Sequence, residues 1–160
     1  ADIDLIYELY LNTNAEYKEP AHLNRTFFAL LIKRMPDNIV AFFVKEDQKA
    51  VAMTFALKSE NRLFSRYWGA KKFIKFLHFE LTYYRIMEYA IRNNIGYIDG
   101  GAAGFHKKDR AMTPVEVHHA HWVNDPHFTN HASEQINKTR ENWRQFFKEQ
   151  ESRKIYKKES

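Results

Sequence analysis

The sequence predicts an α+β domain, within the broad α/β class, whose mixed and mostly antiparallel sheet is flanked by helices. Three runs rich in β-branched and aromatic residues follow one another, joined by short, charged, turn-like links, at 38–44, 50–57 and 62–68. Apolar residues then recur at helical spacing over 72–93, and a further strand is expected at 95–101. Three hairpin-linked strands followed by a helix that crosses to another strand define this fold class.

Helices are also expected at both ends of the chain. The first has apolar residues at helical spacing, namely Leu5, Ile6, Leu9 and Tyr10. A second begins after Asn24 as its N-cap and ends before Pro36. After residue 101 we expect a strand at 113–123. A long charged helix follows from Ser133, and residues 132–160 are assigned to this C-terminal helix. Residues 1–160 are expected to form a single domain.

Composition limits the classes of protein. A chain of 160 residues, 44% hydrophobic, is long enough to bury about two thirds of its unfolded surface as one domain. A net charge of +5 suits anionic ligands without naming one.

The lack of cysteine excludes disulfides, a thiolate nucleophile and cysteine-ligated zinc, and cytoplasmic localisation is expected. No apolar run reaches the ~18 residues that span a bilayer. Because the chain begins at Ala1 rather than methionine, we expect it to be processed or cut from something longer.

The segment 66–72 joins an aromatic strand end to a glycine and two lysines. Gly69 permits a tight backbone ahead of a helix whose first turn would carry Lys71 and Lys72. Free amides at a helix N-terminus beside two ammonium groups would form an anion site. The alternative is a plain strand-to-helix turn with solvated lysines, which the local sequence alone favours slightly.

Glu80 lies on an apolar stripe of the helix predicted at 72–93. A carboxylate expected to be buried must be satisfied by another group. It is therefore a candidate general base or acceptor-binding group, or else the partner of an arginine or of a tyrosine hydroxyl, and the sequence supports both equally. His78 is about 200° away around the helix, at ~100° per residue, so the two form no dyad.

A glycine-rich turn at 100–107 reads Gly-Gly-Ala-Ala-Gly-Phe-His-Lys. Gly101 and Gly104 allow a backbone to approach a ligand closely. In the same turn, the His106 imidazole beside the Lys107 ammonium would take a proton from an amine and stabilise a developing oxyanion. The alternative is a flexible loop without such a role.

Two further features are candidate binding sites. On the strand expected at 113–123, His119 and His121 share one face, but spacing fixes no third ligand, so no metal site is expected. The last helix is rich in lysine and arginine with glutamates interleaved. Alternating signs favour a solvated face, and the alternative is a helix that contacts tRNA.

These motifs follow one another between Arg66 and Trp122 as R-Y-W-G, L-H-F-E, G-G-A-A-G-F-H-K and H-A-H-W. In this order the chain resembles the second half of the FemAB-like predicted N-acyltransferases, relatives of the GNAT acetyltransferases and of enzymes that add amino acids to peptidoglycan precursors. The resemblance implies a GNAT-like acyl-CoA N-acyltransferase fold, with the acyl donor where strands 62–68 and 95–101 splay apart. The sequence departs from the family pattern at Ala103 and Phe105, which replace a glutamine and a glutamate. The GNAT pyrophosphate signature Q/R-x-x-G-x-G/A is absent.

The resemblance implies transfer of an acyl or aminoacyl group, from acyl-CoA or aminoacyl-tRNA, to a small-molecule amine acceptor. The catalytic candidates are then Glu80, His106 and Lys107. The donor-binding candidates are Gly69, Lys71, Lys72, Gly101 and Gly104. The acceptor-binding candidates are Arg66, Tyr67, Trp68, His121 and Trp122.

Two expectations concern the whole protein. The family typically carries two GNAT-like lobes and this chain aligns with the second, so we expect a second lobe or a homodimer. The alternative function is a non-catalytic module of the same fold that binds a ligand or a partner, and it is favoured by the glutamate lost at Phe105.

Overall fold

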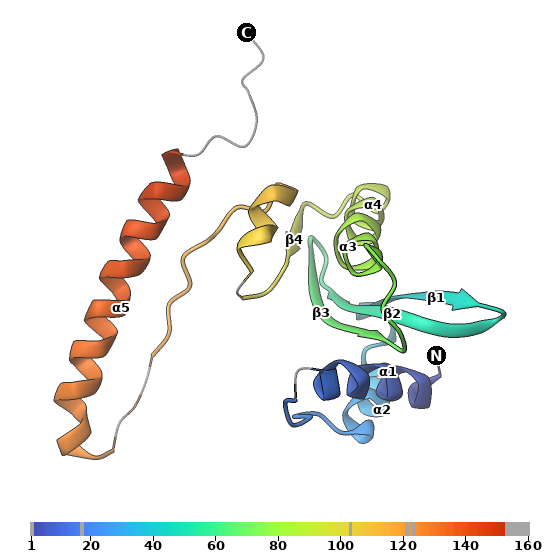
Figure 1. Ribbon diagram of the computed structural model, residues 1–160, viewed down its shortest axis with the longest axis horizontal. Coiled ribbons are helices and arrows are strands. Elements are labelled where there is room, and N and C mark those ends of the chain that lie inside the picture. The colour runs from blue at the N-terminus through green and yellow to red at the C-terminus, as the bar shows by residue number, and fades with distance from the viewer. Residues whose placement is uncertain (1, 17, 103, 121, 123, 153–160) are drawn as a thin grey trace, which may run out of the picture. The chain divides into compact units, whose positions relative to one another are not determined.

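The computed structural model describes residues 2–16, 18–102, 104–120, 122 and 124–152. The chain divides into two compact units, Ala1–Ala103 and Gly104–Ser160. The first unit contains the sheet and the helices that cover it, and the second contains the long helix α5 (Figure 1).

The first unit is built on a four-stranded sheet in the order β1-β2-β3-β4. Its strands are β1 (Ile39–Glu46), β2 (Lys49–Lys58), β3 (Arg62–Ala70) and β4 (Tyr97–Asp99). The first two pairings are antiparallel and β3 pairs with β4 in parallel. Short links allow the antiparallel pairings, whereas a parallel pairing needs a crossover, here made of helix. The predicted fold class, a mostly antiparallel sheet flanked by helices as in the GNAT-like fold, is confirmed.

Two helices, α1 (Ile3–Glu16) and α2 (Arg25–Arg34), cover one side of the sheet (Figure 1). The Asn24 side chain accepts a hydrogen bond of 2.9 Å from the Phe27 amide, which confirms the predicted N-cap. As predicted, α2 ends before Pro36, and the short turn η1 (Pro36–Asn38) follows it. Six buried residues form the core on this side, namely Ile6, Leu9, Tyr10, Phe28, Met53 and Phe55.

On the opposite side lies one continuous helical segment made of α3 (Leu77–Phe79), η2 (Glu80–Tyr84) and α4 (Arg85–Arg92) (Figure 1). Its core residues are Val40, Ala56, Leu63, Ile86, Ala90 and Ile95. The middle part, η2, is a π turn in which the Arg85 amide bonds to the Glu80 carbonyl. The Thr82 hydroxyl donates to the His78 carbonyl at 2.7 Å and so helps to satisfy the widened turn.

The predicted start of this helix at residue 72 is wrong, because the helix begins at Leu77. Residues 71–76 form a loop, and Phe76 at its end has φ +67°. A left-handed backbone cannot continue a right-handed helix, so the helix cannot extend back toward Lys72. The helical segment is buried on one side only. Ile86 and Ala90 are buried, whereas Tyr84 and Ile91 are exposed.

The second unit contains the short helix η3 (Phe105–Arg110) and α5 (Pro126–Ser152). The strand predicted at 113–123 is wrong for its described residues, 113–120 and 122, none of which lies in a strand. A run of suitable residues becomes a strand only when another strand pairs with it, and this unit supplies none in its described part. The last helix is confirmed as far as Ser152 but starts at Pro126 rather than Ser133, and the predicted part at 153–160 lies outside the described residues.

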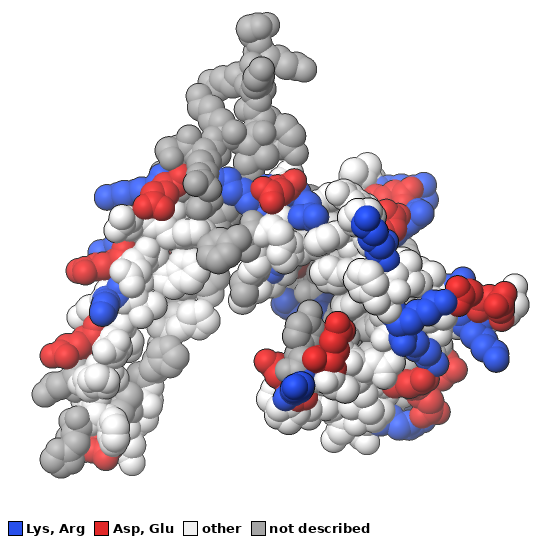
Figure 2. Space-filling model, viewed as in Figure 1, with Lys and Arg blue, Asp and Glu red and all other residues white. Residues whose placement is uncertain are grey.

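The charges on the surface of α5 agree with the solvated face predicted for the last helix. Blue and red side chains alternate along its visible face in Figure 2, so neither sign dominates there. Its aromatic residues gather near one another, with ring centroids of Trp143 and Phe146 separated by 5.3 Å. None of the helices in the described part of the chain has both the length and the apolar character needed to cross a bilayer.

Candidate functional site

The candidate site lies where β3 and β4 part. Their pairing covers only three positions, from Arg62 opposite Tyr97 to Phe64 opposite Asp99. Beyond that point β4 ends, whereas β3 continues through Ala70. From Ser65 to Ala70 the far edge of β3 therefore has no strand partner in the described part of the first unit. The two strands that the resemblance assigns to the donor site do pair and then separate.

A bulge redirects β3 at the beginning of this open edge. Phe55 of β2 is opposite Tyr67, whereas the next residue, Ala56, is opposite Ser65, so Arg66 is the extra residue of the bulge. Such a bulge bends its strand and re-aims side chains, and bulges are common beside functional sites. The Arg66 guanidinium lies over the ring of Phe64, with its carbon 5.2 Å from the ring centroid.

The glycine turn after β4 lies next to Arg66. Gly101 has φ +73°, a conformation that glycine adopts at little cost, and its amide donates to Asp99 Oδ1 at 2.8 Å. A Cβ built on Gly101 would lie 4.0 Å from Arg66 Nη1. The structure therefore brings together Arg66, predicted for the acceptor, and Gly101, predicted for the donor.

Trp68 joins the open edge to the helical segment. Its ring meets the ring of His78 edge-on, with centroids 5.2 Å apart, and the Trp68 carbonyl accepts a bond of 2.6 Å from Thr13 Oγ1. His78 in turn lies against Tyr83, with ring centroids 6.1 Å apart. Contacts on both sides thus fix Trp68, whose indole is half-buried, at the edge of the sheet.

A buried polar group lies beside Trp68 on the sheet. Thr54 of β2 is its direct cross-strand partner, so the two side chains share one face. The Thr54 hydroxyl is fully buried and has no hydrogen-bond partner within the described part of the chain. An unsatisfied buried hydroxyl costs about 1–3 kcal/mol. Such groups are uncommon in native proteins, and each calls for an explanation such as strain, a catalytic role or a bound water or ion.

Glu80 is not buried, which corrects the expectation from the apolar stripe. Its side chain is 46% exposed, and its Oε1 lies 3.0 Å from Arg85 Nε. A π turn contains one residue more than an α turn, so the apolar stripes of 72–93 do not continue in phase through η2. The contact agrees with the alternative of a structural pair with an arginine, and Arg85 also pairs with Glu88 at 2.8 Å.

Gly69, Lys71 and Lys72 do not lie at a helix N-terminus, so the premise of the predicted phosphate cradle is wrong. The Lys71 amide donates to the Val51 carbonyl at 2.8 Å, which extends the sheet rather than opening a helix. Lys71 Nζ lies 2.7 Å from Glu8 Oε1, and Lys72 Nζ lies 2.5 Å from Glu46 Oε2.

The need for glycine at position 69 comes from α1. A Cβ there would lie 2.0 Å from the carbonyl oxygen of Leu9, which no real side chain could occupy. Gly69 is buried where β3 and α1 touch, and this contact explains the glycine without a ligand.

Tyr67 faces the core under α1 and α2 rather than the open edge. Its ring centroid lies 5.4 Å from that of Tyr10 and 5.8 Å from that of Phe28. Burial raises the pKa of the Tyr67 hydroxyl above its ordinary value, and the neighbouring Tyr10 adds to the shift.

This raised pKa gives a testable pH dependence. The folded state holds the Tyr67 proton more tightly than the unfolded state does. The contribution to stability is therefore complete below the unfolded pKa of about 10 and is lost as pH rises through the folded pKa. Between neutral pH and a pH above 10, the free energy of unfolding measured with urea should fall less in Tyr67→Phe than in the parent protein. Equal losses would show that another group governs the alkaline transition.

The remaining predicted site residues belong to the second unit. Gly104, with φ +92°, precedes η3, and the His106 carbonyl accepts from Arg110 Nη1 at 2.7 Å. His106 is exposed and Lys107 is half-buried. Trp122 is 90% exposed. His121 lies outside the described residues, and the described ones contain no group of three or more potential metal ligands.

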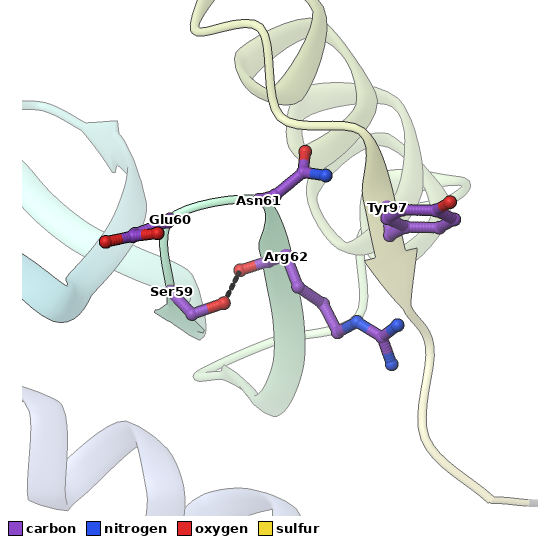
Figure 3. A pocket seen from close by; sticks show the side chains of 5 residues that line it. All are labelled: Ser59, Glu60, Asn61, Arg62 and Tyr97. Atoms are coloured by element: carbon purple, nitrogen blue, oxygen red, sulfur yellow. Dashed lines mark hydrogen bonds between the residues drawn. The ribbon is translucent and has the colours of Figure 1, made fainter.

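One pocket of the first unit was not predicted. It has a volume of about 430 Å³ and lies at the turn between β2 and β3, beside the start of β4 (Figure 3). Its lining residues are Ser59, Glu60, Asn61, Arg62 and Tyr97. Asn61 Oδ1 accepts from the Gly96 amide at 2.6 Å, and the Arg62 guanidinium lies 5.3 Å from the Tyr97 ring centroid.

This pocket is separate from the open edge. Arg62 and Tyr97 begin their strands, whereas the edge lies beyond the end of β4. The sequence gives no signal for the pocket, because Asn61 and Gly96 are 35 positions apart and neither belongs to a motif.

Comparison with known proteins identifies the family. A family model described as peptidoglycan biosynthesis/recognition, FemAB-like, matches residues 1–158. A search of curated proteins finds no match to the chain. The family match spans nearly the whole sequence, including Arg66, Trp68 and Gly101 at the open edge of β3. The chain therefore belongs to the FemAB-like family of peptidoglycan biosynthesis and recognition proteins.

Proposed function

We propose that this chain is an N-acyltransferase with a peptidoglycan-related role, which moves an acyl or aminoacyl group from an activated donor to an amine. The observation that carries the proposal is the open edge of β3 beyond Phe64, with Arg66 and the Gly101 turn beside it. Membership of the FemAB-like family supports the peptidoglycan-related part. A cytoplasmic location belongs to the same proposal, because acyl-CoA and aminoacyl-tRNA are cytoplasmic donors.

The proposed binding mode follows from the chemistry of a strand edge. Backbone amides and carbonyls of an edge that no strand pairs can hydrogen-bond an extended ligand as a further strand would. At Trp68 the carbonyl already accepts from Thr13 Oγ1, so the ligand would bond the other groups of the edge. The donor arm would occupy this edge, and the Arg66 guanidinium would attract an anionic group of the donor or acceptor. Glycine at position 101 would let a ligand approach the backbone closely.

The proposed reaction is nucleophilic attack of the acceptor amine on the acyl carbonyl carbon. The new C–N bond forms as the bond between the acyl carbon and its carrier breaks. The amine proton must pass to a base, and the carrier leaves with a proton. We propose Glu80 as this base, because its carboxylate is partly exposed and Arg85 fixes its position.

A matched pair of variants tests the role of Glu80. Glu80 and Glu88 both pair with Arg85 on the same helical segment. Glu80→Gln is expected to lower transfer by ~10²-fold, as for loss of a general base, whereas Glu88→Gln should leave it unchanged. Transfer would be measured with acyl-CoA and with aminoacyl-tRNA as donors, and melting temperature would confirm that both variants fold. Equal activity of the two variants would reject Glu80 as the base.

The second candidate function is a non-catalytic binding module, and Phe105 in place of the family's glutamate favours it. This candidate predicts that donor binding weakens in Arg66→Ala although the parent protein transfers no acyl group from any donor. Turnover by the parent protein that depends on Glu80 or His106 would exclude it.

A further inference from the structure

The loop 71–76, which we call the Lys-Phe loop, reads Lys-Lys-Phe-Ile-Lys-Phe and joins β3 to α3. Its apolar side chains face solvent. Phe73 is 91% exposed, Phe76 is 68% exposed and Ile74 is 36% exposed. Single exposed apolar residues are ordinary, but three within four positions form a patch of the kind that marks an interaction surface.

The backbone of the Lys-Phe loop holds these side chains in solvent. The Leu77 amide donates to the Ile74 carbonyl at 3.1 Å, and the Glu80 amide donates to the Phe76 carbonyl at 3.0 Å. Phe76 has φ +67°, which is unfavourable for a bulky residue. Backbone strain of this kind persists only where the surrounding structure enforces it, and it is concentrated at functional positions.

The stretch of sequence that contains the Lys-Phe loop carries charge of one sign. From Arg62 to Phe79 the sequence has five lysines and arginines and no aspartate or glutamate. Lys71 and Lys72 pair with Glu8 and Glu46, but these pairs are about half exposed. Exposed pairs contribute little and exchange readily for other anions. Lys75 Nζ lies 5.0 Å from the Phe76 ring centroid, so its charge is held beside the apolar patch.

We propose that the Lys-Phe loop docks on the surface of an anionic phospholipid bilayer. Phe73, Ile74 and Phe76 would enter the boundary between headgroups and acyl chains, while the three lysines contact lipid phosphates. Interleaved lysines argue against a protein partner, because the cores of protein interfaces are depleted in lysine. Membrane–water boundaries, in contrast, combine aromatic rings with cationic side chains. The proposal does not depend on the proposed acyl transfer.

Vesicle sedimentation of the full chain tests the proposal. We expect binding to phosphatidylcholine vesicles that contain phosphatidylglycerol, weakening as salt rises, and little binding to phosphatidylcholine alone. Phe73→Ser should weaken binding about tenfold, because a buried ring is returned to water. Lys75→Gln should weaken it about fivefold. Phe73 is so exposed that its replacement should leave the melting temperature unchanged.

The matched control is the double variant Tyr84→Ser, Ile91→Ser. Both residues are apolar, at least half exposed and in the same unit, but they lie outside the Lys-Phe loop. The control should bind anionic vesicles like the parent protein. The proposal is overturned if the parent protein fails to bind at low salt, or if the control loses as much binding as Phe73→Ser. It is also overturned if Phe73→Ser converts a dimer into a monomer in sedimentation without any vesicle binding, since the loop would then contact a second copy.

Discussion

Replacing Gly69 with alanine is expected to lower the free energy of unfolding by about 3 kcal/mol or more. The new methyl carbon would lie 2.0 Å from the carbonyl oxygen of Leu9 and 2.4 Å from its carbonyl carbon. Both are backbone atoms of α1, so no side-chain rotation relieves the clash. The helix would have to move away from β3 and from the core that Leu9 helps to form. Urea unfolding followed by circular dichroism measures the loss.

Gly101→Ala is the matched control for this variant. Gly101 has φ +73°, but the nearest atom to an added Cβ is 4.0 Å away, so only backbone strain opposes the change. That strain costs about 1 kcal/mol. Equal losses in the two variants would contradict the assigned contact between β3 and α1. If Gly69→Ala kept its stability and lost donor binding instead, the donor role predicted for Gly69 would be restored.

Phe28→Ala is expected to be similarly severe, with a loss of about 3–5 kcal/mol. Phe28 is fully buried and is the main anchor of α2 in the core. Its ring lies 5.3 Å from Tyr10, 5.9 Å from Phe55 and 5.8 Å from Tyr67, measured between centroids. Removing the ring leaves a cavity among side chains that belong to helices and strands, so it cannot collapse easily. Thermal and urea unfolding should both show the loss.

The neighbouring residue supplies the control. Phe27 has the same side chain in the same turn of α2 but is 37% exposed. Phe27→Ala should cost no more than about 1.5 kcal/mol, because part of its surface is already in water. A larger loss from Phe27→Ala than from Phe28→Ala would mean that the core faces the other side of α2.

The strands were predictable because their signals are local. Runs rich in β-branched and aromatic residues, joined by short charged links, predicted the three antiparallel strands to within two residues at each end. Asn24 and Pro36 likewise marked α2 through their own backbone preferences. The π turn at Glu80 and the left-handed Phe76 were not predictable, since both depend on the surrounding packing. For the same reason residues 113–120 resembled a strand but lack the partner that would make them one.

The candidate site was predictable only in part. Arg66 and Gly101 stood out as members of motifs, and the parallel pairing of β3 and β4 brings them together. The burial of Tyr67 against Tyr10 and Phe28 was not visible, because the bulge at Arg66 decides which side of the sheet Tyr67 faces. The contact of Gly69 with Leu9 spans 60 positions of sequence, and no local pattern encodes it.

The short pairing of β4 has a consequence for the order in which the first unit gains and loses structure. The three antiparallel strands are joined by tight turns, so their pairing closes only small loops. β4 pairs with β3 at three positions, and the loop closed between Arg62 and Tyr97 spans 35 residues. Loop closure costs entropy before distant contacts repay it, so β4 docks after the meander has formed. The same step in reverse opens the unit locally while the meander stays paired. Partial unfolding therefore begins at the β3–β4 junction, beside Arg66 and Gly101, where Ile98 leaves its partner Leu63, while the core that contains Phe28 stays closed.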